Sequence, residues 1–222
     1  MLSIWFPNVQ WDAVIQATNE TLYMSAISVI VTFILGLALG LALFLTSPGN
    51  LWENKFLNGL IAVVVNVFRS IPFIILIILL IPFTRFLVGT MLGAEAALPA
   101  LIIGAAPFYA RMVEIALREI NKGVIEAARS MGATNAQIIF KVLIPESLPA
   151  LISGITVTAI ALVSYTAMAG VVGAGGLGNL AYMEGYQRDN ADVTLVSTAL
   201  ILVIVFIIQW IGDRITTALD KR

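Results

Sequence analysis

Long runs of hydrophobic residues, separated by short polar stretches, dominate the pattern of this sequence. A transmembrane helix needs roughly 20 consecutive apolar residues to cross the hydrocarbon core of a bilayer. Five runs reach that length, so we expect an all-α integral membrane protein in which residues 1–222 form a single transmembrane domain. The predicted spans are residues 22–45, 57–81, 98–117, 148–172 and 193–212.

The second run differs from the others because polar residues and a proline lie inside it: Asn66, Arg69, Ser70 and Pro72. Proline removes a backbone donor and kinks a helix. A guanidinium at membrane depth costs about 2.5–3.5 kcal/mol or more. Arg69 is therefore expected to face protein or a water-filled path. An equally weighted alternative is that its side chain reaches to the membrane surface.

Two further patterns concern helix packing. In the first run, Gly36 and Gly40 lie four residues apart, a spacing at which small residues let helices approach closely. Packing within the chain is the simpler interpretation, and a dimer face is the alternative. At the end of the third run, Arg111, Glu114 and Arg118 follow helical spacing, so they can form ion pairs on one face of a helix that leaves the membrane.

The most polar stretch lies between the third and fourth runs and extends from Gly123 to Pro149. Its first part, Val124–Met131, is rich in residues that favour helices, and Gly132 ends it. Val124, Ile125, Ala128 and Met131 give this helix an apolar face. Physical chemistry alone leaves two partners open for that face, the groove of another protein or the lipid headgroups.

A second helix is predicted directly after Gly132. Thr134 and Gln137 are three residues apart, the spacing of a capping box, and the helix is expected to run through Val142. Pro145 and Pro149 are then expected to turn the chain before the fourth span. The polar stretch therefore predicts two short helices joined at a glycine.

Composition and charge support a membrane protein and give it an orientation. Hydrophobic residues make up 60% of the chain and charged residues only 11%, against about 25% charged in soluble domains. Placing the polar stretch in the cytoplasm gives a clear excess of Lys and Arg inside, which predicts an external N-terminus and a cytoplasmic C-terminus. The inside set is Lys55, Arg111, Arg118, Lys122, Arg129, Lys141, Arg214, Lys221 and Arg222, against Arg85 and Arg188 outside.

The inventory of residues argues against an enzyme. The chain has no Cys and no His, which excludes zinc centres, thiol nucleophiles and imidazole bases. The net charge of −1 argues against a nucleic-acid partner. Gly173, Gly175 and Gly178 match a dinucleotide-binding pattern, but a predicted membrane helix precedes them where that motif requires a strand. We interpret these glycines as a tight re-entrant turn.

The polar stretch also carries a family signature. Glu126, Ala127, Ala128 and Gly132 resemble the cytoplasmic loop of ABC importer permeases. The signature ends in an aliphatic residue, any residue, a second aliphatic residue and proline. Val142, Ile144 and Pro145 take these places here, where Ile and Leu are the usual aliphatic residues. In that family the loop, residues 118–147 here, forms a coupling helix that sits in a groove of an ATPase subunit.

The resemblance covers nearly the whole chain. Asn66–Phe73, Pro107–Ala133 and Ala167–Gln187 are similar to permeases of methionine importers. This resemblance implies the five-helix type I importer fold and a homodimer, surrounded by lipid, in the bacterial cytoplasmic membrane. It also implies two ATPase subunits, which bind ATP and Mg, and an extracytoplasmic substrate-binding lipoprotein. The chain itself has no phosphate-binding Walker loop.

The resemblance assigns expected roles to two sets of residues. The ATPase-coupling set is Glu126, Ala127, Ala128, Gly132 and Pro145, and the set for a translocation path or gate is Asn66, Arg69, Ser70, Pro72, Tyr165 and Met168. Met168 lies among small residues and is expected to gate the path, with ordinary packing as the alternative. The alternatives in function are a permease for another amino acid or small polar solute, and a membrane scaffold or binding protein without transport.

Overall fold

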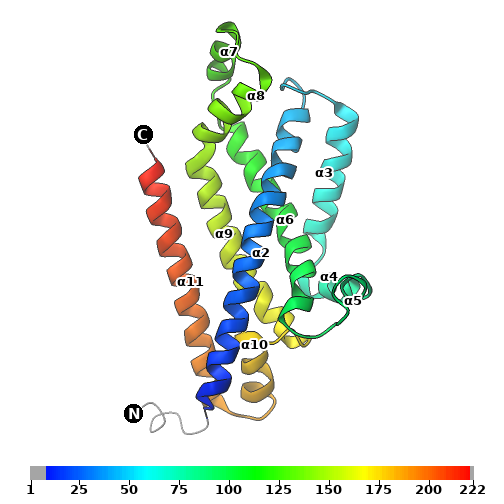
Figure 1. Cartoon of the computed structure of the whole chain (residues 1–222), viewed down its shortest axis with the longest axis vertical. Coiled ribbons are helices and arrows are strands. Elements are labelled where there is room, and N and C mark those ends of the chain that lie inside the picture. Colours follow the sequence, from blue (N-terminus) through cyan, green and yellow to red (C-terminus); the bar gives the residue numbers. More distant parts are fainter. Residues whose placement is uncertain (1–8, 221–222) are drawn as a thin grey trace. The chain divides into compact units, whose positions relative to one another are not determined.

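The computed structural model describes residues 9–220, and every regular element within them is helical (Figure 1). Two of the elements, η1 and η2, are stretches of wide π-helix. In chain order the elements are α2 (Trp11–Thr46), α3 (Lys55–Ser70), α4 (Phe73–Leu79), α5 (Ile81–Val88), α6 (Ala94–Arg118), α7 (Lys122–Ser130), α8 (Asn135–Ile138), η1 (Ile139–Leu143), α9 (Ile144–Val171), α10 (Gly176–Leu180), η2 (Ala181–Tyr186) and α11 (Ala191–Leu219).

Four of the helices in residues 9–220 are long and apolar enough to cross a membrane, or five if α3 and α4 together count as one broken span. Their ends extend beyond the predicted spans. The first helix begins at Trp11 rather than near Leu22, and the last continues to Leu219. The positions at which a bilayer meets each helix therefore remain predictions. Of the residues used to predict orientation, Lys221, Arg222 and the N-terminus lie outside the described part of the chain.

The second hydrophobic run does not form one kinked helix. Helix α3 ends at Ser70, and Pro72 is the N-cap of α4 with a φ of −56°. The ring of Pro72 disfavours helical geometry at Ile71, and its missing N–H removes a helical hydrogen bond. A proline just before the first turn of a new helix lacks only a donor that would have no partner inside that helix. The run therefore separates into two helices at this point.

The chain divides into two compact units, and the divisions fall inside four of the long helices. Unit 1 comprises the chain up to Val31, Ile71–Gly104 and Ala159–Gln209, and unit 2 comprises Thr32–Ser70, Ala105–Thr158 and the chain from Trp210.

Unit 2 has a core around the buried ring of Tyr109, together with Val113, Leu117 and Leu143. Helices α2 and α6 approach each other at glycines. A Cβ on Gly36 would lie 2.7 Å from the Tyr109 ring, and one on Gly40 would lie 2.5 Å from the Cβ of Val113. The predicted packing within the chain is confirmed at both glycines.

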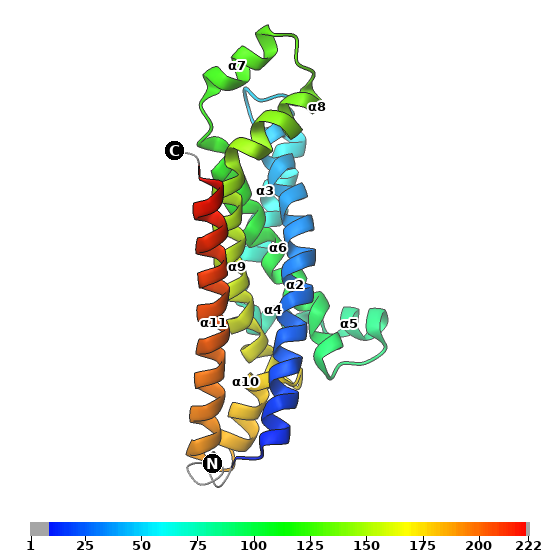
Figure 2. The same cartoon turned by 60° about the vertical axis from the view of Figure 1, so that its left-hand side comes forward.

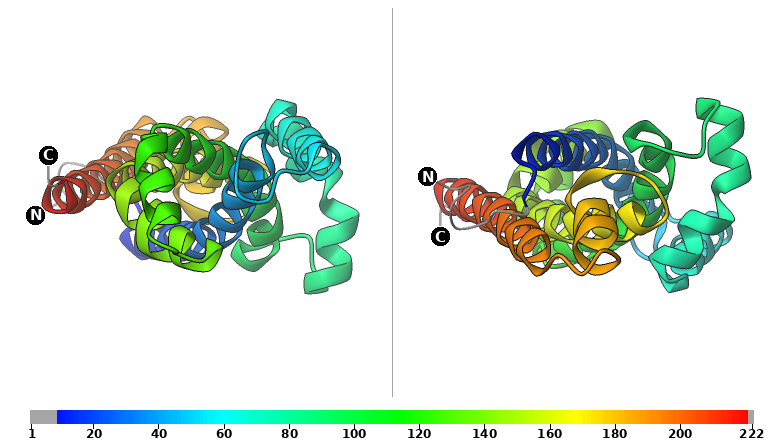
Figure 3. Two further views of the ribbon diagram at one scale, coloured as in Figure 1. Left: turned by 90° about the horizontal axis from the view of Figure 1, so that it is seen from above. Right: turned by 90° about the horizontal axis from the view of Figure 1, so that it is seen from below.

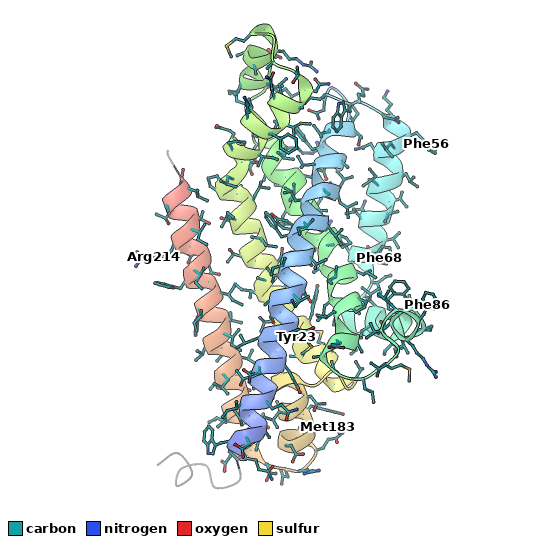
Figure 4. The ribbon with its side chains drawn as sticks, in the orientation of Figure 1. Tyr23, Phe56, Phe68, Phe86, Met183 and Arg214 are labelled. Carbon is teal, nitrogen blue, oxygen red and sulfur yellow. The ribbon has the colours of Figure 1, made fainter. Side chains whose placement is uncertain are left out.

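Unit 1 has a core of Ala17, Val163, Leu177 and Ile204, which brings together parts of α2, α9, α10 and α11. Helix α5 of this unit projects to one side (Figure 2). Its residue Phe86 is 88% exposed and points away from the neighbouring helices (Figure 4). Such exposure is expected for a side chain that contacts lipid.

Candidate functional site

The polar stretch forms an elbow at one end of unit 2, in which α7 and α8 meet at Gly132 (Figure 1; Figure 3, left). The side chain of Asn121 caps α7 by accepting a hydrogen bond from the Gly123 N–H at 2.8 Å. Gly132 has a φ of +81°, a left-handed value that glycine adopts without a steric penalty. The prediction of two helices joined at a glycine is confirmed.

The predicted capping box at the start of α8 is also confirmed. The Gln137 N–H donates to Thr134 Oγ1 at 3.3 Å, and the Thr134 N–H donates to Gln137 Oε1 at 2.9 Å. Two backbone donors of the first turn, which have no partner inside a helix, are satisfied in this way. The capping box therefore fixes the direction in which the chain leaves the elbow.

The predicted end of this second helix is wrong. The helical segment that begins at Asn135 does not end at Val142, and the chain does not turn at Pro145 and Pro149. The backbone stays helical through the π-helical stretch η1 and continues into α9.

A wide turn lies directly before the two prolines near the start of α9. Within η1 the Ile144 N–H donates to the Ile139 carbonyl, one residue further back than in an α-helix. Pro145 then lies in the first turn of α9, and Pro149 lies inside the same helix. The buried Ser147 hydroxyl, between the two prolines, donates to the Leu143 carbonyl at 2.7 Å.

The apolar face predicted for α7 is divided between the interior and the solvent. Ala128 is only 5% exposed and belongs to the core of unit 2, and Ile125 packs against the same core. Met131 is 81% exposed and Val124 is 42% exposed. Half of the face thus seats the helix on its own chain, and the other half is open to a partner.

The expected ATPase-coupling residues divide in the same way. Glu126, Ala127, Gly132 and Pro145 are exposed, whereas Ala128 is buried. Their contacts with an ATPase remain predictions. A shallow pocket next to Glu126 has charged walls from Lys122 and Arg129 and is closed by the α2–α3 loop at Asn50.

An ion-pair cluster lies where α6 approaches the elbow, as the charge spacing predicts. The carboxylate of Glu114 is buried and accepts hydrogen bonds from Arg111 Nη1 and from Arg118, whose Nη2 lies 2.7 Å away. The two guanidinium groups are about half exposed, so they keep part of their hydration. The cluster stabilises the end of α6, from which the elbow begins.

The polar residues of α3 share one exposed face in unit 2. Asn66, Arg69 and Ser70 are all exposed, and the Ser70 hydroxyl donates to the Asn66 carbonyl at 2.8 Å. Val65, one helical turn before Arg69, is buried beside this face. The other exposed side chains of this helix are apolar, among them Val63 and Val67. Helix α3 therefore has a buried face, an apolar exposed face and a polar exposed face.

The remaining path residues belong to unit 1. The ring of Tyr165 stacks on the buried ring of Phe73, with centroids 4.4 Å apart and planes within 1° of parallel. Met168 is 43% exposed and shares a face of α9 with Ser164 and Val171, which are also exposed. Pro72 directly precedes Phe73. The stacking of Phe73 on Tyr165 therefore joins the start of α4, where the second run is broken, to α9.

Some residues of this region were not identified from the sequence. Phe73 was one, because its partner Tyr165 lies far away along the chain. Glu20 and Thr21 of α2 were two more, and both accept hydrogen bonds from the turn that contains Gly176. Polar residues, among them Asp12, Gln16 and Asn19, gather in the first eleven residues of α2, and this cluster was the available signal.

Residues 34–222 match the family described as binding-protein-dependent transport system inner membrane component. The chain belongs to this family. Its members are permease subunits, consistent with an elbow that is half exposed and with a chain made largely of membrane-spanning helices.

The relatives are similar over their whole lengths. The methionine import system permease protein MetP of Bacillus subtilis is 68% identical over 222 residues, with 100% of both chains covered. The probable D-methionine transport system permease protein MetI of Pasteurella multocida is 49% identical, over 96% of this chain and 98% of the relative. A structure of the inward-facing MetNI methionine ABC transporter matches with a TM-score of 0.92 and 47% identity, covering 98% of each chain.

Proposed function

We propose that this chain is the membrane-spanning subunit of an ATP-driven importer of methionine. The observation that carries the proposal is the full-length similarity, at 68% identity, to a methionine import permease. The elbow supports the same function, because an exposed helical segment on a permease is suited to contact a separate ATPase. ATP and Mg are bound by that ATPase and not by this chain.

The working transporter is proposed to contain two copies of the chain, two ATPase subunits and an extracytoplasmic binding protein. The elbow lies in the cytoplasm of a bacterial cell, and the turn between α9 and α10 lies outside. The excess of Lys and Arg on the side of the elbow supports this orientation.

In this assembly the elbow transmits force between subunits. Glu126, Ala127 and Met131 are exposed and contact the ATPase, and the small side chain of Ala127 permits close approach. The buried Ala128 has a different role and seats α7 on the core of unit 2. Gly132 supplies the bend, and Pro145 begins the long helix that carries Tyr165 and Met168.

The polar face of α3 is proposed to line the translocation path. Asn66, Arg69 and Ser70 share a face that lipid would not solvate, since a charged group in hydrocarbon is costly. The adjacent apolar face of the same helix is free to meet the lipid instead. This division favours a water-filled path for Arg69 over an interfacial position.

Met168 is proposed to act as the gate. It is exposed on a face of α9 with Ser164 and Val171, and its side chain is flexible enough to fill an irregular gap between two subunits. ATP binding closes the ATPase pair and moves the elbows, and the helices that carry Met168 then part on the outer side. Hydrolysis returns the transporter to the inward-open state.

Uptake by a reconstituted transporter tests this function. Vesicles that contain the chain, its ATPase and its binding protein should accumulate labelled methionine only when ATP is supplied. Matched vesicles without the ATPase serve as the control. Uptake that is absent with all components, or that another amino acid suppresses far better than methionine does, contradicts the proposal.

A further inference from the structure

Unit 1 contains a turn of glycines between α9 and α10, where the sequence predicts a tight turn. Gly173, Gly175 and Gly176 all have φ values between +81° and +96°. Helix α9 ends at Val171, and the five-residue helix α10 begins at Gly176. An isolated helix of that length is not stable in water, so α10 depends on contacts with other parts of the chain.

Helix α2 supplies those contacts from the other end of the sequence. The carboxylate oxygen Oε2 of Glu20 accepts a hydrogen bond from the Gly176 N–H at 2.7 Å. Thr21 Oγ1 accepts one from the Leu177 N–H at 2.8 Å. These two amides open α10 and have no acceptor within that helix. Two neighbouring side chains of α2 therefore cap α10, and we name this pair of hydrogen bonds the latch.

Both side chains of the latch are fixed from within α2. The Gln16 Nε2 group donates to the other carboxylate oxygen of Glu20 at 2.9 Å. The Thr21 hydroxyl donates its own proton to the Ala17 carbonyl at 3.0 Å, which leaves its lone pairs for Leu177. Thr21 is also buried. The acceptors are thus oriented before α10 meets them.

The turn has no space for larger residues beside the latch. A Cβ on Gly176 would lie 2.8 Å from Thr21 Oγ1, and one on Gly175 would collide with the Glu20 carboxylate. Glycine is therefore required for the close approach of α2 as well as for the left-handed backbone. A carboxylate near the first amides of a helix also has a favourable electrostatic interaction with the helix dipole.

Two further hydrogen bonds join the turn and α10 to other segments of unit 1. The Gly93 N–H, in the α5–α6 loop, donates to the Gly173 carbonyl at 3.0 Å. The Asn179 side chain donates to the Gly170 carbonyl near the end of α9 at 2.8 Å. Helix α10 thus folds back against α9 and continues into η2 (Figure 3, right).

The segment that the latch positions is exposed. Met183 of η2 is accessible (Figure 4). Tyr186 is also accessible, and Glu184 forms an ion pair with Arg188 at 2.6 Å. Residues 181–188 therefore present polar and aromatic groups together on the surface of unit 1.

We propose that Glu20 and Thr21 are positioning residues, whose latch makes α2 and α10 move as one body and holds η2 in place while the binding protein acts on the transporter. The role in transport rests on the proposed function, whereas the latch itself is a property of the fold. Loss of the latch leaves α9, α11 and the buried core of Ala17 and Leu177 intact, but gives α10 and η2 more freedom to move relative to α2.

Hydrogen exchange in the complete transporter complex reports directly on whether the two hydrogen bonds of the latch are formed. We expect Thr21→Val and Glu20→Ala to speed exchange of the Gly176 and Leu177 amides by about tenfold or more, because each loses an acceptor. Thr18→Val is the matched control, since the Thr18 hydroxyl bonds only to the Val14 carbonyl of its own helix. Unchanged exchange in both latch variants overturns the proposal.

Stimulation of ATP hydrolysis by the binding protein measures the proposed role of the latch in transport. We expect Thr21→Val and Glu20→Ala to keep the ATP hydrolysis of the complex without binding protein and to lose about tenfold in the stimulated rate. Glu20→Gln and Thr21→Ser retain an oxygen acceptor and should recover most of the stimulation, which a general loss of stability would not allow. Stimulation equal to wild type in both latch variants overturns the proposed role.

The two proposals fail in different ways. If the wild-type complex shows no methionine uptake and no stimulation by the binding protein, the proposed function is wrong, and the exchange measurement still decides whether the latch exists. If wild type transports methionine and the latch variants do so equally well, only the role of the latch is wrong. The amount of assembled complex, compared by gel filtration, identifies a variant that has not folded.

Discussion

The elbow at Gly132 and the turn at Gly173–Gly178 both bend the chain at glycines, but different forces hold them. A Cβ on Gly132 would meet no atom within 4 Å, so this glycine is needed only for its backbone conformation. The turn glycines lie against α2 and α9, and added side chains would collide with their neighbours. The elbow is open for a partner, and the turn is closed by its own chain.

The two regions also differ in the range of their hydrogen bonds. The caps of the elbow join residues two or three positions apart, at Asn121 with Gly123 and at Thr134 with Gln137. The latch joins residues 156 positions apart in the sequence. An element made from local bonds is able to move without unfolding its surroundings, which suits a part that contacts another subunit.

The largest effect on stability is expected for Gly178→Val. A Cβ at this position would meet the backbone of Ala167, including its carbonyl oxygen, and backbone atoms do not give way as a flexible side chain does. We expect a loss of about 3 kcal/mol or more in stability, measured by thermal unfolding in detergent. Gly59→Val is the control, because nothing lies within 4 Å of that site. Equal unfolding temperatures for the two variants would contradict the conclusion that neighbouring backbone crowds Gly178 and leaves Gly59 free.

A smaller effect on stability, with a larger one on transport, is expected for Gly132→Val. The left-handed backbone costs about 1–2 kcal/mol for a residue with a side chain, and there is no steric collision to add. The complex should assemble, but methionine uptake should fall because the elbow no longer has its bend. Gly132→Asn should be milder, since asparagine tolerates this conformation. Normal uptake by the valine variant would argue against the coupling role.

Removal of the helix cap with Thr134→Ala should cost about 1 kcal/mol, the usual value of an N-cap. The loss should be confined to the elbow, and it is detected as faster hydrogen exchange at the Gln137 amide. Thr134→Ser keeps the hydroxyl and should behave like wild type. Faster exchange that spreads into the glycine turn of unit 1 would contradict the local character of the elbow.

The smallest effect on stability is expected for Met131→Ala. This side chain is 81% exposed, and substitutions at such sites usually change stability by about 0.5 kcal/mol or less. Association with the ATPase should nevertheless weaken, which titration of the two purified components measures. Met91→Ala removes another exposed methionine outside the elbow and is the control. If both variants bind the ATPase equally, Met131 is not part of the contact.

Short-range patterns made most of the fold predictable. The apolar runs, the break at Gly132 and the capping box of Thr134 and Gln137 were all identified, because each depends on residues within one or two helical turns. The charge spacing around Glu114 was correct for the same reason. Periodicity also found the apolar face of α7, but it could not tell that Ala128 faces the core while Met131 faces outward.

The failures share a physical cause as well. Pro145 and Pro149 predict a turn because local rules disfavour proline in helices, yet the helix continues from the wide backbone of η1 through both prolines, and the residue types do not specify that wide turn. The latch from Glu20 to Gly176 depends on the packing of α2 against α10. A pattern within one or two helical turns does not predict contacts between residues so far apart in the sequence, and these contacts become visible in the folded chain.

The π-helical stretch Ile139–Leu143 also accommodates one extra residue in the long helical segment that contains it. A wide turn holds one more residue than an α-helical turn. Deleting a single residue there would restore an ordinary α-helical turn and leave α8 and α9 nearly in their present rotation about the helix axis, because the wide turn and the α-helical turn each make one rotation. The wide turn therefore accommodates one surplus residue without changing the direction in which the elbow points, and a deletion there would remove the wide backbone before Pro145 while the elbow keeps its direction.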